Sequence, residues 1–192
     1  GKVDYDLLYQ NRLPLLRKAY QRSNINDVQA YRRFIHENEW WLDDYALFMA
    51  LKSFFGGQLW TQWPQDIRMH YGYALDYYRE KLYFDIEFQQ CLQFKFFQQW
   101  LKLKKYANDK GIQIIGDMPI YVSLDSSDVW AHPELFQLDE ENKPTAIAGC
   151  PPDAFSEDGQ LWGNPLYNWD KMKELNFDWW IRRMAAAGKL YD

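Results

Sequence analysis

The side chains best suited to chemistry lie in the second half of the sequence, beginning at Asp117. This aspartate closes a short isoleucine-rich run, residues 112–117, that is typical of a buried parallel strand with a charged group at its carboxyl end. In α/β folds, ligands bind at the carboxyl ends of such strands. We therefore expect Asp117 to face a ligand.

A long loop rich in amides and aromatic rings follows this aspartate. Residues 118–170 show little periodicity, and their Phe, Trp, Tyr and Leu content argues against disorder. Aromatic rings can stack on the apolar faces of a sugar while amides pair with its hydroxyls. The alternative is that most of the rings belong to the core. We predict a ligand-facing role for Phe155, Gln160, Trp162 and Asn164.

Other familiar chemical motifs are missing. The three histidines and two cysteines are isolated from one another, so no metal-ligand spacing or disulfide framework is present. The sequence has neither a glycine-rich phosphate loop nor a nucleophile elbow. Residues 125–128 (Asp-Ser-Ser-Asp) offer two carboxylates, for which capping of a short helix is favoured over catalysis.

The composition narrows the classes of partner. The 192 residues are 47% hydrophobic and 19% aromatic, which is sufficient for a core, and the net charge of -5 disfavours nucleic acid and anionic membranes. No apolar run reaches the roughly 18 residues of a membrane span, and the first residues do not resemble a signal peptide. We therefore expect a cytoplasmic protein.

The elements that would position these side chains are predicted to be mostly helical. A first helix should open with Pro14 in its first turn, and Asp27 should cap a second. A third should carry Asp43 and Asp44 in its own first turn, where carboxylates suit the helix dipole. Helical spacing is found over residues 40–55, 65–81, 82–109 and 171–187.

Glycines are expected to end two of these helices. Gly111 should cap the helix before the predicted strand, and Gly188 should cap the last one. Residues 189–192 would then open another strand. Because the sequence stops within a β–α alternation and begins without Met, we expect an excised fragment.

Several segments together resemble the 4-alpha-glucanotransferases, a family also called amylomaltases or disproportionating enzymes. The central block includes Gly116-Asp117-Met118-Pro119 and Gly159-Gln160-Leu161-Trp162-Gly163-Asn164-Pro165, and further similarity appears upstream and between them. The matching segments are residues 41–48, 97–100, 116–122, 125–130, 149–153 and 159–167.

The resemblance implies an α/β fold: a predominantly helical fragment of a (β/α)8 TIM barrel, with a helical insertion, truncated before barrel strand four. Residues 1–110 would form the helical insertion, and 111–192 a partial barrel with strand three, the glucan-covering loop and the next helix. The family transfers segments of α-1,4-glucans between maltooligosaccharides by a retaining, two-carboxylate mechanism. It needs no metal or organic cofactor.

The resemblance also assigns roles to single residues. Asp117 is similar to an aspartate on the floor of the family's site, and Phe155, Gln160, Trp162 and Asn164 match the loop that closes over the glucan. The catalytic nucleophile and acid/base match no residue here, so the chain alone is predicted to be inactive. Tyr5 lies near a tyrosine that serves a secondary glucan site in some relatives, and Ala154 replaces a tyrosine that some relatives carry.

Two other functions remain open at this stage. A non-catalytic carbohydrate-binding module would fit the aromatic loop and the absent nucleophile. A hydrolase of the α-amylase type would share the site but would differ in how well it excludes water.

Overall fold

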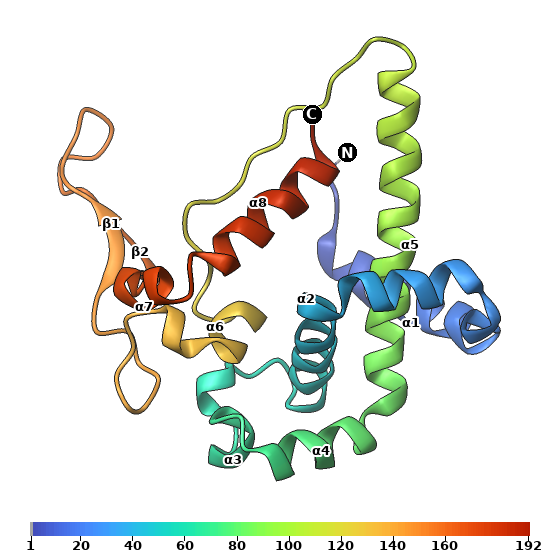
Figure 1. Cartoon of the computed structure of the whole chain (residues 1–192), viewed down its shortest axis with the longest axis horizontal. Coiled ribbons are helices and arrows are strands. Elements are labelled where there is room, and N and C mark those ends of the chain that lie inside the picture. Colours follow the sequence, from blue (N-terminus) through green and yellow to red (C-terminus); the bar gives the residue numbers. More distant parts are fainter. Residues whose placement is uncertain (1) are drawn as a thin grey trace.

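A computed structural model describes residues 2–192 of the chain. Eight α-helices, three short 3₁₀ helices and a two-stranded sheet follow one another in this part of the chain (Figure 1). Their bounds are α1 Tyr5–Gln21, η1 Ile25–Asp27, α2 Gln29–Phe54, η2 Trp60–Gln62, α3 Gln65–Arg68, α4 Gly72–Lys81, α5 Tyr83–Asn108, α6 Ser127–Ala131, η3 Pro133–Leu135, β1 Ile147–Cys150, β2 Gln160–Pro165, α7 Trp169–Glu174 and α8 Asp178–Leu190.

The first helix begins earlier than predicted. The side chain of Asp4 accepts a hydrogen bond from the backbone N–H of Leu7, which caps α1 at its N-terminus. Pro14 consequently lies inside α1, so its predicted first-turn position is wrong. The capping bond of Asp4 starts the helix before Pro14, which then removes one internal hydrogen bond.

Helix α2 joins two segments that were predicted to be separate. No Gly or Pro interrupts the sequence between residues 28 and 54, so the helix continues without a break. Asp27 lies in η1 rather than capping α2, whose N-cap is Val28. Asp43 and Asp44 therefore lie in the middle of α2, and the prediction that they occupy a first turn is wrong.

Aromatic side chains fill the centre of the main core. Trp60 and Trp130 are wholly buried, and the rings of Phe48, Trp63 and Trp130 pack with centroids 5.5–5.8 Å apart. The buried indole N–H of Trp130 donates to the carbonyl of Ile67 at 3.1 Å. Contacts of this kind between α2, α6 and the α3 region confirm that many of the rings are core.

The predicted strand at residues 112–117 does not form. The segment is extended, but within residues 2–192 its backbone bonds to the far end of the chain only at Ile114, which accepts from Asp192 N–H at 2.9 Å and donates to the Asp192 carboxylate at 2.8 Å. A strand requires a neighbour that pairs along its length. Ile115 is 94% exposed, so the prediction of a buried strand is wrong in this structure.

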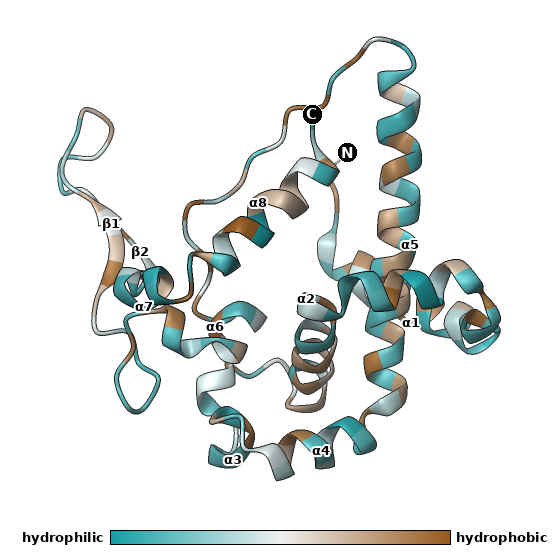
Figure 2. Cartoon of the chain, viewed as in Figure 1, coloured by the Kyte–Doolittle hydropathy of each residue, from teal (hydrophilic) through white to brown (hydrophobic). Residues whose placement is uncertain are grey.

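Side chains hold the extended segment, residues 112–124, which we name the strap. Tyr167 donates to Ile120 O at 2.8 Å, and Arg183 donates to Pro119 O at 2.6 Å. The Trp60 indole donates to Leu124 O at 2.6 Å. Figure 2 shows that the strap carries several hydrophobic residues although it runs along the outside.

The last helical region is split in two. Asn176 and Phe177 have positive φ angles of 53° and 55°, which ends α7 and starts α8 in a new direction. Gly188 lies within α8, so its predicted capping role is wrong, whereas Gly111 has φ +74° just after α5, as a C-terminal cap requires. Lys189 and Leu190 still lie in α8, so the prediction that a strand opens at residue 189 is wrong, and only Tyr191 after the helix is extended.

The chain exposes a large surface for its size. Its accessible surface is 13179 Å², against about 9,700 Å² expected for a compact monomer of this mass. The chain is mostly helical, with a small antiparallel sheet. None of the helices described is long and apolar enough to cross a membrane.

Candidate functional site

The hairpin formed by β1 and β2 carries most of the predicted site residues. The two strands pair antiparallel, with Gly149 opposite Leu161 and Cys150 opposite Gln160. A Cβ on Gly149 would lie 2.3 Å from the carbonyl oxygen of Gln160, so only glycine allows this close approach. The absence of a side chain at Gly149 therefore allows β1 and β2 to lie this close together.

The tip of the hairpin is ordered by a local network. One carboxylate oxygen of Asp153 accepts from the N–H groups of Phe155 and Ser156, each at 2.8 Å. The hydroxyl of Ser156 donates to Gly159 O at 2.7 Å. This turn leaves Phe155 95% exposed, so its ring projects into solvent.

The hairpin is fastened to the strap beside Asp117. The amide of Asn164 donates to Val122 O at 2.8 Å, and the Trp162 ring lies 6.2 Å from the Tyr121 ring. Trp162 and Asn164 together with Asp117 line one open hollow. The structure therefore brings together three of the predicted residues from two distant segments.

The other predicted residues lie apart from this hollow. Gln160 accepts from the Trp162 indole at 3.0 Å and adjoins the hollow through that ring, whereas Phe155 lies farther out at the tip. Tyr5 is 68% exposed at the start of α1, and Figure 1 shows this helix apart from the hairpin. The hollow is thus built from Asp117, Trp162 and Asn164, with Gln160 at its edge.

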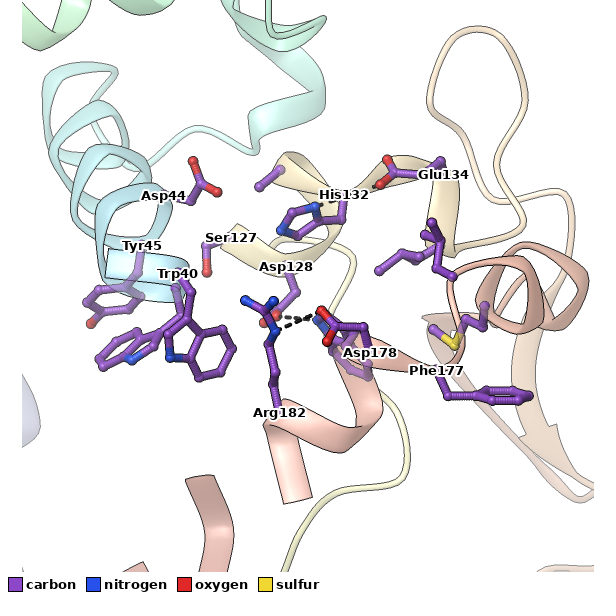
Figure 3. Close-up of a pocket in the computed structure, with 16 residues that line it drawn as sticks. Trp40, Asp44, Tyr45, Ser127, Asp128, His132, Glu134, Phe177, Asp178 and Arg182 are labelled. Atoms are coloured by element: carbon purple, nitrogen blue, oxygen red, sulfur yellow. Dashed lines mark hydrogen bonds and ion pairs between the residues drawn. The ribbon is translucent and has the colours of Figure 1, made fainter. Parts of the chain in front are cut away.

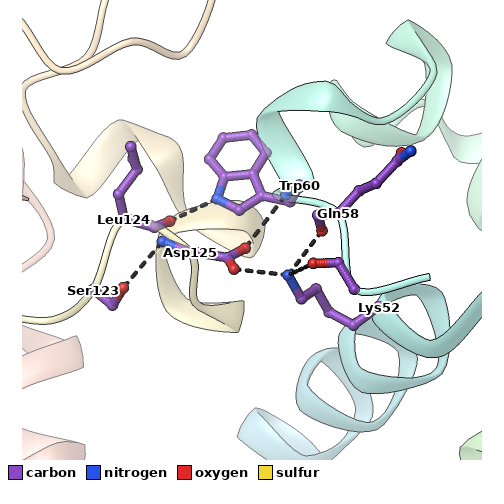
Figure 4. A network of polar contacts seen from close by, with 7 residues as sticks. Lys52, Gln58, Trp60, Ser123, Leu124 and Asp125 are labelled. Carbon is purple, nitrogen blue, oxygen red and sulfur yellow. Dashed lines mark hydrogen bonds and ion pairs between the residues drawn. The ribbon is translucent and has the colours of Figure 1, made fainter. Parts of the chain in front are cut away.

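A polar network supports the strap where it meets the helices (Figure 4). Lys52 Nζ, near the end of α2, lies 2.7 Å from an oxygen of Asp125 and also donates to the carbonyls of Gly57 and Gln58. The other Asp125 oxygen accepts from Trp60 N–H at 3.3 Å. This network fixes the strap end that bears Val122, and thereby the anchor of Asn164.

The predicted capping segment has divided roles. The Ser126 hydroxyl caps α6 by accepting from Val129 N–H, which confirms capping by residues 125–128. The two carboxylates do something else: Asp125 binds Lys52, and Asp128 accepts from the Trp179 indole at 3.1 Å.

A second, more enclosed hollow was not predicted from the sequence. This interhelical cavity has a volume of about 380 Å³ and lies between α2, α6, η3 and the start of α8 (Figure 3). Its labelled polar residues include Asp44, Asp128, His132, Glu134, Asp178 and Arg182. The only sequence signal for this cavity was the group of aromatic residues at Trp40, Trp41 and Tyr45. Their helical spacing favoured the interpretation that they belong to the core.

One ion pair in this cavity changes the proton affinity of its members. His132 Nδ1 lies 3.7 Å from Glu134 Oε1, and this carboxylate raises the pKa of His132 against the effect of burial. Burial raises the pKa of Glu134, but the His132 imidazole, the backbone N–H of Glu134 and the charge of Lys171 together outweigh it, so the pKa is lowered. No group of three His, Cys, Asp or Glu within residues 2–192 is arranged to hold a metal ion.

Comparison with known proteins decides the family. A profile described as 4-alpha-glucanotransferase matches residues 1–192. The chain belongs to the 4-alpha-glucanotransferase family. It is 49% identical to the 4-alpha-glucanotransferase of Streptococcus pneumoniae, covering all of this chain and 38% of that protein. It is 46% identical to that of Clostridium butyricum, covering 99% of this chain and 39% of that protein.

A solved structure agrees with this membership. The amylomaltase from Streptococcus agalactiae in complex with acarbose is similar over 100% of this chain and 40% of its own, with a TM-score of 0.91 and 49% identity. The chain thus spans about two fifths of the length of the relatives that it matches.

Proposed function

We propose that this chain is the glucan-covering part of a 4-alpha-glucanotransferase. The complete protein would cleave an α-1,4 bond, hold the glycosyl unit on a carboxylate and pass it to a sugar hydroxyl with retention. The observation that carries this proposal is the family match over the whole chain, together with the hollow that Asp117 shares with Trp162 and Asn164.

The residues of this chain would bind and shield the glucan. The Trp162 ring is 48% exposed and offers a face for a sugar ring, while the carboxylate of Asp117 accepts hydrogen bonds from hydroxyls. Asn164 uses its N–H on Val122, which leaves its carbonyl oxygen for the ligand. We propose that Phe155 at the hairpin tip and Gln160 extend this wall, so that the hairpin covers the glucan and limits access of water.

Two parts of the proposal lie beyond the hollow. Tyr5 on α1 is proposed as part of a separate glucan contact, because its ring is exposed and lies apart from the hairpin. Residues 112–117, the first part of the strap, are proposed to be barrel strand three of the complete protein. Ile112 and Ile115, which are 58% and 94% exposed, would then be covered by neighbouring strands.

Product analysis tests the proposed activity. The complete protein that carries this chain is incubated with maltotriose and its products are separated by chromatography. We expect glucose together with maltooligosaccharides longer than maltotriose, since transfer lengthens the acceptor. Only shorter sugars would identify a hydrolase instead, and unchanged maltotriose would favour a binding module.

Two assays test the proposal that this chain binds the glucan while the catalytic carboxylates belong to the rest of the complete protein. Because the resemblance locates the nucleophile and the acid/base outside these residues, the 192-residue chain alone should release no glucose from maltotriose. In the complete protein, Trp162→Ala should raise KM about tenfold, since one stacking contact of about 1–1.5 kcal/mol is lost. Trp169→Ala, which removes another exposed indole outside the hairpin, is the control.

A further inference from the structure

Residues 117–121 of the strap line the open hollow beside the hairpin. Within residues 2–192 no strand pairs with this stretch, so the ladder of a sheet does not set its position. Side chains hold its carbonyl groups instead. Pro119 O accepts from Arg183 of α8 at 2.6 Å. Ile120 O accepts from Tyr167, which follows β2, at 2.8 Å. The wall of the hollow therefore depends on two side chains that lie outside it.

The local sequence makes this stretch of the strap stiff. Pro119 has a fixed φ angle and no N–H, and the residue before a proline is restricted to extended conformations. That residue is Met118, and it alone separates Pro119 from Asp117. Because neither linking residue can readily absorb a change of backbone angle, a shift of Pro119 O moves Asp117 as well. The bond from Arg183 is thus a constraint on the carboxylate that lines the hollow.

The two anchoring side chains are themselves held by aromatic packing. Tyr167 is 2% exposed, and its ring centroid lies 5.7 Å from that of Trp179 and 5.3 Å from that of Trp180. The Arg183 guanidinium lies 5.0 and 5.2 Å from the centroids of the same two indoles. It also donates to the Tyr167 hydroxyl at 3.3 Å. That hydroxyl donates in turn to Ile120 O, so one polarised chain of hydrogen bonds runs from α8 to the strap.

The neighbouring arginine shows that this contact is specific to one position of α8. Successive residues of an α-helix lie about 100° apart around its axis. Arg182 accordingly pairs with Asp178 at 2.7 Å and lies 5.6 Å from the centroid of the Trp40 ring. Within residues 2–192 it makes no hydrogen bond to the strap. Two adjacent side chains of the same type therefore differ in one respect that bears on the hollow.

We propose that Arg183 is a positioning residue for glucan transfer, which holds Asp117 in place through the strap. The inference rests on the proposed function, in which the hollow receives the glucan. Arg183 does not line the hollow, so its effect on the reaction passes through the residues that do. Misplacement of a substrate-binding group by about 1 Å can lower a reaction rate on the order of a hundredfold. Loss of Arg183 should therefore lower activity more than it lowers the amount of folded protein.

Kinetics of the complete protein with maltotriose test this role, with glucose release as the readout. Arg183→Ala should lower kcat/KM about tenfold or more, because Pro119 O and the Tyr167 hydroxyl both lose their donor. Arg183→Lys should restore part of this loss, since an ammonium group can reach one acceptor but lacks the planar fork that reaches two. Arg182→Ala is the matched control and should stay within about twofold of the unsubstituted protein. Equal losses for the two alanine variants overturn the inference.

A double-mutant cycle separates positioning from a merely structural role. In an Asp117→Asn background, Arg183→Ala should lower kcat/KM by less than about threefold further, because residues that act through one another are not additive. The full tenfold loss in both backgrounds overturns the inference. If Asp117→Asn has no measurable turnover, the same cycle is read from affinity for acarbose, the ligand of the related Streptococcus agalactiae structure, by titration calorimetry.

A second variant covers misfolding of Arg183→Ala, which circular dichroism would reveal. Tyr167→Phe keeps the packed ring and removes only the bond to Ile120 O, and it should show the same coupling to Asp117→Asn. Additive losses for this variant also overturn the inference. Failure of the proposed function is recognised separately, because the unsubstituted complete protein would then release no glucose from maltotriose.

Discussion

The packed centre of the molecule and its strap-and-hairpin region use hydrophobic side chains in opposite ways. In the centre, Trp60 and Trp130 are 0% exposed and their indole N–H groups find backbone carbonyls. In the other region, Ile115 and Phe155 are 94% and 95% exposed. The apolar rings of the centre are therefore covered by the described residues, whereas the strap and hairpin leave large apolar side chains exposed.

Substitution of a wholly buried ring in the centre should cost much more unfolding free energy than substitution of an exposed ring in the hairpin. Trp130→Ala should lower the free energy of unfolding by about 3–5 kcal/mol, because it opens a cavity beside Phe48 and Trp63 and removes the bond to Ile67. Phe155→Ala should change it by less than about 0.5 kcal/mol. Urea denaturation followed by fluorescence measures both, and similar losses would refute the division into two regions.

The junction between the regions should show the next largest effect. Asp125→Ala leaves the half-buried ammonium of Lys52 without its carboxylate, which should cost about 2 kcal/mol of unfolding free energy. The control is Asp109→Ala, which breaks the exposed pair with Lys105 and should cost less than about 0.5 kcal/mol. Equal costs in denaturation would show that the Lys52 network does not fasten the strap.

Two glycine substitutions should have opposite signs. Gly163 in β2 has φ +77°, so Gly163→Ala should destabilise the chain by about 1 kcal/mol through backbone strain. Gly188 lies inside α8 with no atom within 4 Å of an added Cβ, so Gly188→Ala should stabilise by about 0.5 kcal/mol. Thermal unfolding of both variants checks the signs, and a stabilising Gly163→Ala would contradict the hairpin backbone described here.

The smallest expected effect depends on pH and lies in the interhelical cavity. The raised pKa of His132 means that its protonated form stabilises the fold below about pH 6.5 and that this contribution is lost as pH rises through the higher folded value. The lowered pKa of Glu134 means that its contribution is present above about pH 4.5 and is lost as pH falls through the lower folded value. The pair therefore stabilises most between these limits.

Substitution of His132 tests whether the pair stabilises the fold most between about pH 4.5 and pH 6.5. His132→Gln should be less stable than the unsubstituted chain near pH 5.5 and nearly equal at pH 8, as measured by the melting temperature across pH. His36→Gln serves as the control, because the His36 pair with Glu39 is far more exposed. A difference that grows toward pH 8 would contradict the sign of the His132 shift.

The sequence was most informative where local rules decide the structure. Helical spacing over residues 82–109 predicted the helical region that forms α5, although it left open one helix or two, and the turn chemistry around Gly111 located its end. The residues around Trp162 were predicted to face a ligand because one short segment holds both rings and amides, and this stays a prediction. Helix starts were less predictable, since capping by Asp4 and the lack of a breaker before Asp43 outweighed single-residue preferences.

Features that depend on distant segments could not be predicted. The pairing of residues 112–117 requires neighbouring strands, and within the described residues only Asp192 bonds to this backbone from a distant segment, through two hydrogen bonds at Ile114. The interhelical cavity joins residues near 40, 130 and 180, and no spacing rule relates segments so far apart. The assignment of 1–110 as a helical insertion and of 111–192 as a partial barrel remains a prediction.

The exposed strap has a practical consequence for handling the protein. Residues 112–116 form an extended, uncharged, isoleucine-rich segment, and the backbone groups of Gln113 and Ile115 find no hydrogen-bond partner among residues 2–192. Segments of this kind template cross-β stacking between molecules. The same apolar run that would complete a sheet within one protein therefore makes the 192-residue chain prone to fibril formation at high concentration.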